Sequence, residues 1–227
     1  MKQILYIFSF VLATTAIAQN TTSTELQKQK IKQALAYGDK IIAADAMYSI
    51  VAIEGPQSTY KDSLAYLYFN ARNFVSCFLV TNDILSYKEN NLELLEMKAV
   101  SLENMGALDK AKEAYASLLT KTNNNFHAYK IAGLELALNK FEEALVSIKK
   151  ADQLPDEGKL SVTFQVNKNY NQNVSLKAAI AYLEGLTYLN LKKDKEAKAS
   201  FERAVQLFPE FVLAKSKLTT LEAKTTN

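Results

Sequence analysis

Residues 178–211 read AAIAYLEGLTYLNLKKDKEAKASFERAVQLFPEF, and this stretch decides the fold. It places a small residue at Gly185, with an aromatic side chain three positions later, and a second small residue at Ala197. Phe201 follows after four positions, and Pro209 stands near the end of the stretch. Helices whose axes approach to about 8–10 Å need small side chains where they cross. The stretch therefore predicts two antiparallel helices in close contact.

The same pattern recurs upstream with a period close to 34 residues. The first small position recurs at spacings of 34, 34, 34 and 52 residues, at Ile31, Ala65, Ala99, Gly133 and Gly185. The second recurs at spacings of 34, 34, 33 and 53 residues, at Ala43, Cys77, Ala111, Ala144 and Ala197. Such self-similarity predicts stacked helix pairs that bury a continuous core. The predicted repeats span residues 24–57, 58–91, 92–125, 126–158 and 178–211. Ile31 makes the first repeat the weakest match.

Two segments lie outside the repeats. Residues 212–227 keep helical spacing of apolar side chains, which predicts the polar-backed capping helix that a repeat stack requires. In the insertion 159–177, Leu160, Val162 and Phe164 alternate with polar residues, a period of two typical of a half-buried strand. We therefore expect a short β-hairpin or an extended arm at 159–177.

The N-terminus has the features of a signal peptide. Lys2 precedes a short apolar stretch, Ile4–Ala13, and the small residues Ala16 and Ala18 flank a cleavage point after Ala18. The alternative is a transmembrane anchor, but the apolar stretch is shorter than the roughly 20 residues that cross a bilayer. We expect residues 1–18 to be removed and the mature chain to be periplasmic or secreted.

The composition argues against nucleic-acid binding, a disulfide framework and most metal sites. Of the 227 residues, 27 are basic and 24 acidic, so a net charge of +3 gives no reason to expect a nucleic-acid partner. A single Cys and a single His exclude a disulfide framework and the usual multi-Cys or multi-His metal sites. Cys77 falls in a small-residue column and is predicted to be a packing thiol, and His127 to be solvated or capping. We expect no catalytic residue, cofactor or metal.

Residues 178–211, together with the four predicted repeats upstream, resemble the tetratricopeptide repeat (TPR) family. The combination with a signal peptide is similar to exported bacterial TPR proteins, particularly those of the Bacteroidetes group. The resemblance implies an all-α, right-handed superhelix of about five helix pairs, whose first helices line a concave groove for a partner protein or peptide. It also implies a non-catalytic adaptor.

Groove-facing positions follow from the offset to the first small residue of each repeat. The candidates for partner binding are Tyr66, Phe69, Glu96, Val100, Lys130, Leu134, Tyr182 and Leu186. Chaperone-binding TPR domains hold a terminal carboxylate with basic and Asn side chains, whereas Tyr66 and Val100 stand at those positions here and Glu96 would repel a carboxylate. The set instead favours apolar anchors of a helix or an extended segment. Alternatively, about half of these side chains pack against neighbouring repeats.

Two functional hypotheses follow. The first is an exported scaffold that binds a protein or peptide through its groove or its inserted arm. The alternative is a self-associating structural envelope protein, in which the strand 160–166 pairs edge to edge with another copy or fills a neighbour's groove. The arm can also fold back over its own groove as a lid.

Overall fold

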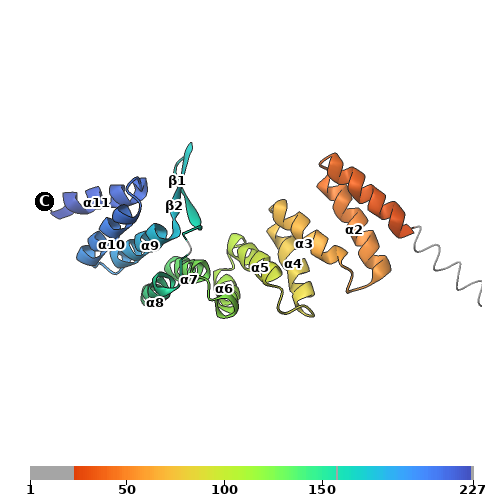
Figure 1. Ribbon diagram of the computed structural model, residues 1–227, viewed down its shortest axis with the longest axis horizontal. Helices are drawn as coiled ribbons and strands as arrows, with labels where there is room; N and C mark the ends of the chain where they lie inside the picture. Colours follow the sequence, from red (N-terminus) through yellow and green to blue (C-terminus); the bar gives the residue numbers. More distant parts are fainter. Residues whose placement is uncertain (1–22, 157, 226–227) are drawn as a thin grey trace, which may run out of the picture. The chain divides into compact units, whose positions relative to one another are not determined.

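The computed structural model describes residues 23–156 and 158–225, so the expected signal peptide at 1–18 lies outside the described residues. The described chain is built from helix pairs and one short two-stranded insertion (Figure 1). It divides into two compact units, unit 1 up to Met105 and unit 2 from Gly106 onward. This division falls inside the third predicted repeat, and the repeat period gave no indication of it.

Unit 1 begins with helical residues 23–36. Its further helices are α2 (Lys40–Glu54), α3 (Tyr60–Asn70), α4 (Phe74–Leu85) and α5 (Leu92–Asn104). Within unit 1, α2 packs on α3, α3 on α4 and α4 on α5. One core cluster centres on Met47, Ile50 and Leu64, and a second centres on Cys77 and Leu94.

Unit 2 contains six helices and the hairpin within its described residues. Its elements are α6 (Leu108–Thr122), α7 (Asn125–Ala137), α8 (Phe141–Gln153), β1 (Ser161–Asn167), β2 (Tyr170–Ser175), α9 (Leu176–Asn190), α10 (Asp194–Leu207) and α11 (Val212–Thr225). The helix α11 packs on α10 and buries Ala214 and Leu221, as expected of a capping helix. No helix among the described residues is long and apolar enough to cross a membrane.

The turns within the helix pairs repeat the sequence period in their backbone geometry. Each turn contains one residue with a positive φ, between 57° and 75°, at Gly38, Arg72, Gly106, Asn139 and Lys192. The spacings of 34, 34, 33 and 53 residues match those of the second small column. A left-handed residue lets the chain reverse direction between two helices, and three of the five positions adopt it without glycine.

The residues of the two small-residue columns are buried, except for Gly133, which is half-buried. All five residues of the second column, at Ala43, Cys77, Ala111, Ala144 and Ala197, are fully buried. The first column is less uniform than expected. A Cβ on Gly185 would lie 2.5 Å from the Phe201 ring, whereas a Cβ on Gly133 would meet nothing within 4 Å. The close crossing predicted for the whole column therefore holds at Gly185 but not at Gly133. The fold is nonetheless the predicted all-α repeat with a short β insertion.

The insertion forms an antiparallel hairpin. Val162 pairs with Val174 and Phe164 with Gln172, and the register is irregular between Gln165 and Asn167. Along β1 the side chains alternate between exposed and half-buried, because one face of the strand rests on unit 2. Figure 1 shows the hairpin rising beside α9, which follows directly after β2.

Candidate protein-binding face

Two stripes of side chains on neighbouring helices form the inner face of unit 1. On α3, Asp62, Tyr66 and Phe69 recur at helical spacing and therefore share one side of the helix. On α5, Glu93, Glu96 and Val100 do the same. A hydrogen bond between the Tyr66 hydroxyl and the Glu93 carboxylate joins the two stripes. We call these six residues the inner face.

The inner face combines exposed and half-buried side chains. Tyr66 is 37% exposed and Glu96 is exposed, while Phe69 and Val100 are half-buried. The Phe69 ring meets Phe74 edge to face at 6.4 Å, which fixes its position. The inner face thus combines the accessible ring of Tyr66 with the half-buried apolar side chains of Phe69 and Val100.

Its charges are partly neutralised within the chain. The Lys88 ammonium donates to the Asp62 carboxylate at 2.7 Å, and this bond raises the pKa of Lys88. The hydrogen bond to Glu93, reinforced by desolvation, raises the pKa of Tyr66 to about 12. None of the described residues forms an ion pair with Glu96, and Glu93 accepts only from the neutral Tyr66 hydroxyl, so the inner face carries two carboxylates without a cation.

The predicted groove residues on α7 lie in a different environment. Leu134 is buried in unit 2. The Lys130 ammonium lies 5.6 Å from the centroid of the Tyr115 ring, a cation–π distance, and its side chain is half-buried. These two residues mainly serve packing within unit 2.

The hairpin covers the predicted groove residues on α9. Tyr182 is only 6% exposed, and its ring lies 5.5 Å from Phe164 of the hairpin and 4.9 Å from Phe211. Leu186 packs against the same cluster, which also contains the fully buried Val174 of β2. Tyr182 therefore contacts the chain's own hairpin, and Leu186 packs against the same cluster.

A glutamine fixes the hairpin to the start of α11. The Gln172 side-chain amide donates to the Glu210 carbonyl, and its oxygen accepts from the Val212 backbone N–H at 3.1 Å. The side chain is buried, so both of its hydrogen bonds are shielded from water. The sequence alone does not single out Gln172, because a local pattern does not reveal a partner 38 residues away.

The two residues with reactive side chains are both buried. Cys77 is fully buried, as predicted, and burial raises the pKa of its thiol. His127, expected to be solvated or capping, is buried instead, and its Nδ1 lies 2.9 Å from the Thr122 hydroxyl. Among the described residues, no three His, Cys, Asp or Glu side chains are grouped as metal ligands would be.

Comparison with known proteins shows which folds this chain is similar to. Residues 177–211 match the family model of the tetratricopeptide repeat. None of the curated proteins compared matches the chain. Among solved structures, the chain is similar to YrrB, described as a TPR protein with an unusual peptide-binding site, at a TM-score of 0.64 and 15% identity over 93% of this chain and 97% of that one. It is also similar to MamA from Desulfovibrio magneticus RS-1, at a TM-score of 0.58 and 15% identity over 76% of this chain and 87% of that one.

The helix pairs, periodic turns and buried small-residue columns define a helical-repeat protein. Its last helix pair matches the tetratricopeptide repeat model, and the fold of the chain is similar to that of solved tetratricopeptide repeat proteins.

Proposed function

We propose that this protein is an exported, non-catalytic scaffold that binds a segment of a partner protein through the inner face of unit 1. The observation that carries the proposal is the contrast between the two predicted groove regions. Tyr66 and Glu96 are exposed on the inner face, whereas Tyr182 is covered by Phe164 of the hairpin. A partner can reach Tyr66 and Glu96 on the surface of unit 1, whereas reaching Tyr182 requires that the hairpin be displaced.

The chemistry of the inner face selects the kind of partner. Tyr66, Phe69 and Val100 suit an apolar or aromatic anchor. Glu96 has no cation among the described residues, so it suits a Lys or Arg beside that anchor. The expected ligand is therefore a helical or extended segment with an apolar anchor and a neighbouring basic residue. The peptide-binding site named for YrrB supports this use of the fold.

Site-specific photo-cross-linking tests this proposal. A photoreactive amino acid replaces Tyr66 in one variant and Leu79, an exposed residue of α4, in the control. We expect a defined cross-linked adduct from position 66 and none from position 79. Adding Glu96→Lys should abolish the adduct because it turns attraction for a basic residue into repulsion. Equal adducts from both positions, or an adduct indifferent to Glu96→Lys, would count against the inner face.

Self-association through the strand 160–166 is the alternative function. One observation favours it: among the described residues, β1 pairs with β2 alone, which leaves its other edge unpaired. However, Phe164 packs against the core of unit 2. A second copy could therefore pair with the backbone of this strand but not with its apolar side chains. Thr163→Lys, which adds a charge beside that edge, should dissociate an oligomer of this kind without disturbing the inner face.

A further inference from the structure

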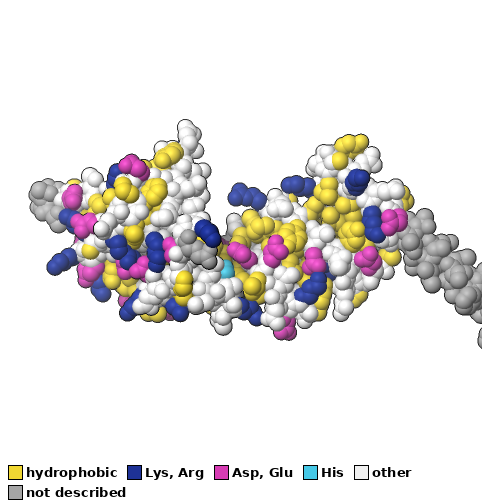
Figure 2. Space-filling view, in the orientation of Figure 1, with side chains coloured by type: hydrophobic (Ala, Val, Ile, Leu, Met, Phe, Trp, Pro, Cys, Tyr) yellow, Lys and Arg dark blue, Asp and Glu magenta, His cyan; other side chains and the backbone are white. Residues whose placement is uncertain are grey.

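The outer face of α2 carries an apolar stripe that the repeat pattern does not require. Ala43, Ala46 and Ile50 are fully buried on the inner side of this helix. On the other side, Ile41 is 82% exposed and Tyr48 is 48% exposed. Figure 2 shows hydrophobic side chains gathered on the surface of unit 1. Single exposed apolar side chains are normal on a protein surface, whereas exposed apolar side chains that share one helix face, as Ile41 and Tyr48 do, can mark an interaction site.

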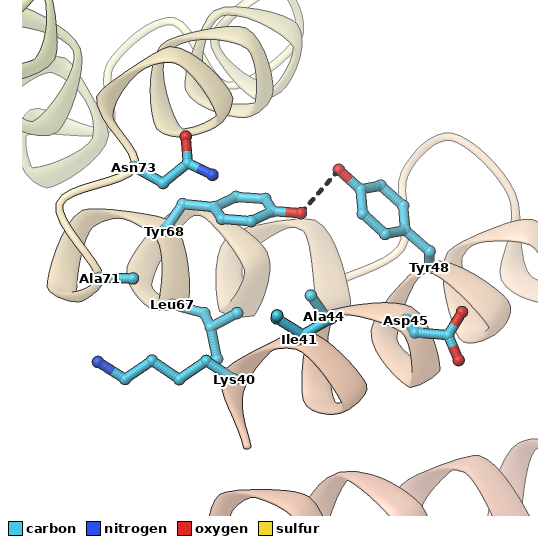
Figure 3. A pocket seen from close by; sticks show the side chains of 9 residues that line it. All are labelled: Lys40, Ile41, Ala44, Asp45, Tyr48, Leu67, Tyr68, Ala71 and Asn73. Atoms are coloured by element: carbon cyan, nitrogen blue, oxygen red, sulfur yellow. Dashed lines mark hydrogen bonds between the residues drawn. The ribbon is translucent and has the colours of Figure 1, made fainter. Parts of the chain in front are cut away.

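Beside this stripe lies a pocket of 380 Å³ between α2 and α3. Its α2 wall consists of Lys40, Ile41, Ala44, Asp45 and Tyr48, and its opposite wall includes Leu67 and Tyr68 of α3 and Ala71 just after it (Figure 3). The Tyr68 hydroxyl donates to the Tyr48 hydroxyl at 3.2 Å, which leaves the rings as apolar walls. The pocket is therefore suited to an apolar side chain and lies directly beside a protruding one.

The spacing of the α2 residues in the pocket is that of a coiled-coil seam. Ile41, Ala44 and Tyr48 occupy successive a, d and a positions, and Lys40 and Asp45 occupy the g and e positions on either side. In such a seam, the knob at an a position enters a hole formed by the partner's g, a and d residues. Here those residues are Lys40, Ile41 and Ala44, which are part of the pocket wall. The face is thus shaped to receive its own protruding residue.

The charges on the two flanks are also complementary. None of the described residues pairs with Lys40, and the Asp45 carboxylate meets Lys30 through Oδ2 alone, at 2.6 Å. At about 100° per residue, Lys40 and Asp45 lie on opposite flanks of the stripe. A cation in the first turn opposes the helix dipole, so Lys40 is not explained by the stability of α2.

We infer that a second copy of this chain covers this face, with the two α2 helices parallel about a two-fold axis. In a parallel pair, the g flank of one helix meets the e flank of the other, so Lys40 of each copy faces Asp45 of its partner five residues on. In an antiparallel pair, like flanks would meet and Lys40 would face Lys40. Ile41 of each copy then fills the pocket of the other.

Sedimentation of the purified protein across a range of concentrations tests the dimer. We expect the wild type to sediment as a dimer and Ile41→Asp as a monomer. The matched control is Val146→Asp, because Val146 is also highly exposed but lies on α8, and this variant should stay dimeric. Circular dichroism spectra should be unchanged in both variants because both side chains are exposed, whereas the melting temperature of Ile41→Asp should lose the concentration dependence that dimerisation gives the wild type. A monomeric wild type, or an Ile41→Asp variant that still dimerises, overturns the proposal.

Charge exchange tests the parallel arrangement without changing an apolar residue. Lys40→Asp alone and Asp45→Lys alone should each weaken dimerisation by about tenfold, since each removes two exposed ion pairs. The double exchange should restore it, whereas Lys30→Gln should leave it unchanged. If the double exchange does not recover affinity, the parallel pairing is wrong. A dimer that dissociates with Thr163→Lys but not with Ile41→Asp belongs to the strand-edge alternative.

Discussion

The ring of Phe164 in β1 meets the ring of Tyr182 in α9 edge to face, with centroids 5.5 Å apart and planes at 85°. This contact places the hairpin over predicted groove residues of the last repeat. Phe211, which immediately precedes α11, completes the cluster at 5.1 Å from Phe164 and 4.9 Å from Tyr182. The insertion is therefore part of the core of unit 2.

We predict that Phe164→Ala lowers the free energy of unfolding by about 2 kcal/mol, because a half-buried aromatic side chain loses apolar burial and its ring contacts. Tyr170→Ala is the control, since Tyr170 is exposed near the tip of the same hairpin. Denaturant unfolding of both variants checks the prediction. Equal stability of Phe164→Ala and the wild type would show that the hairpin is an independent arm.

The strand itself could be predicted from the sequence, whereas the surface on which it packs could not. The alternation of Val162 and Phe164 with polar residues indicates that one face of the strand is buried, because successive side chains of a strand point to opposite faces. The surface that buries this face is made of Tyr182 and Phe211, which are distant in sequence. A single chain carries no periodic signal for such a contact. For this reason the sequence predicts Tyr182 as a groove residue, whereas in the structure it lies under the hairpin.

We predict that Tyr66 titrates with a pKa of about 12, above the usual 10. The raised value means that the folded state holds the phenol proton more tightly, so the associated stability is complete below pH 10 and is lost as the pH rises toward 12. Glu93→Ala should return the pKa toward 10 because the hydrogen bond to the carboxylate is removed. The difference between the ultraviolet titrations of the wild type and Tyr66→Phe isolates this residue. A Tyr66 pKa unchanged by Glu93→Ala would mean that the two helices are not joined there.

We predict that the exported protein begins at Gln19, because small residues at Ala16 and Ala18 fit the signal-peptidase pocket. N-terminal sequencing and intact mass of the protein recovered from the envelope or the medium check the cleavage point. Ala18→Arg should block processing, and Gln19→Ala should not. Recovery of the chain from the cytoplasm with Met1 intact would remove the export part of the proposed function.

The burial of the second small-residue column is the feature that the sequence predicts best. The second small column is fully buried at all five positions, because every helix pair places that residue at its own internal crossing. The first column mixes Ile31, Ala65 and Gly133, and residue type alone does not tell how closely two helices approach. Gly133 and Gly185 hold equivalent sequence positions, yet a Cβ would meet a ring at Gly185 and open space at Gly133.

This difference gives a matched pair of substitutions. Gly185→Ala should destabilise the protein by about 1–3 kcal/mol, because its Cβ would lie 2.5 Å from the ring of Phe201, which is fully buried and has no room to move. Gly133→Ala should stabilise it by about 0.5–1 kcal/mol, because alanine favours the helix and no atom lies within 4 Å of the new methyl group. Denaturant midpoints of the two variants should therefore move in opposite directions from the wild type. Since both changes add the same methyl group to a helical glycine, midpoints that move together would show that the Gly185–Phe201 crossing is not as close as described.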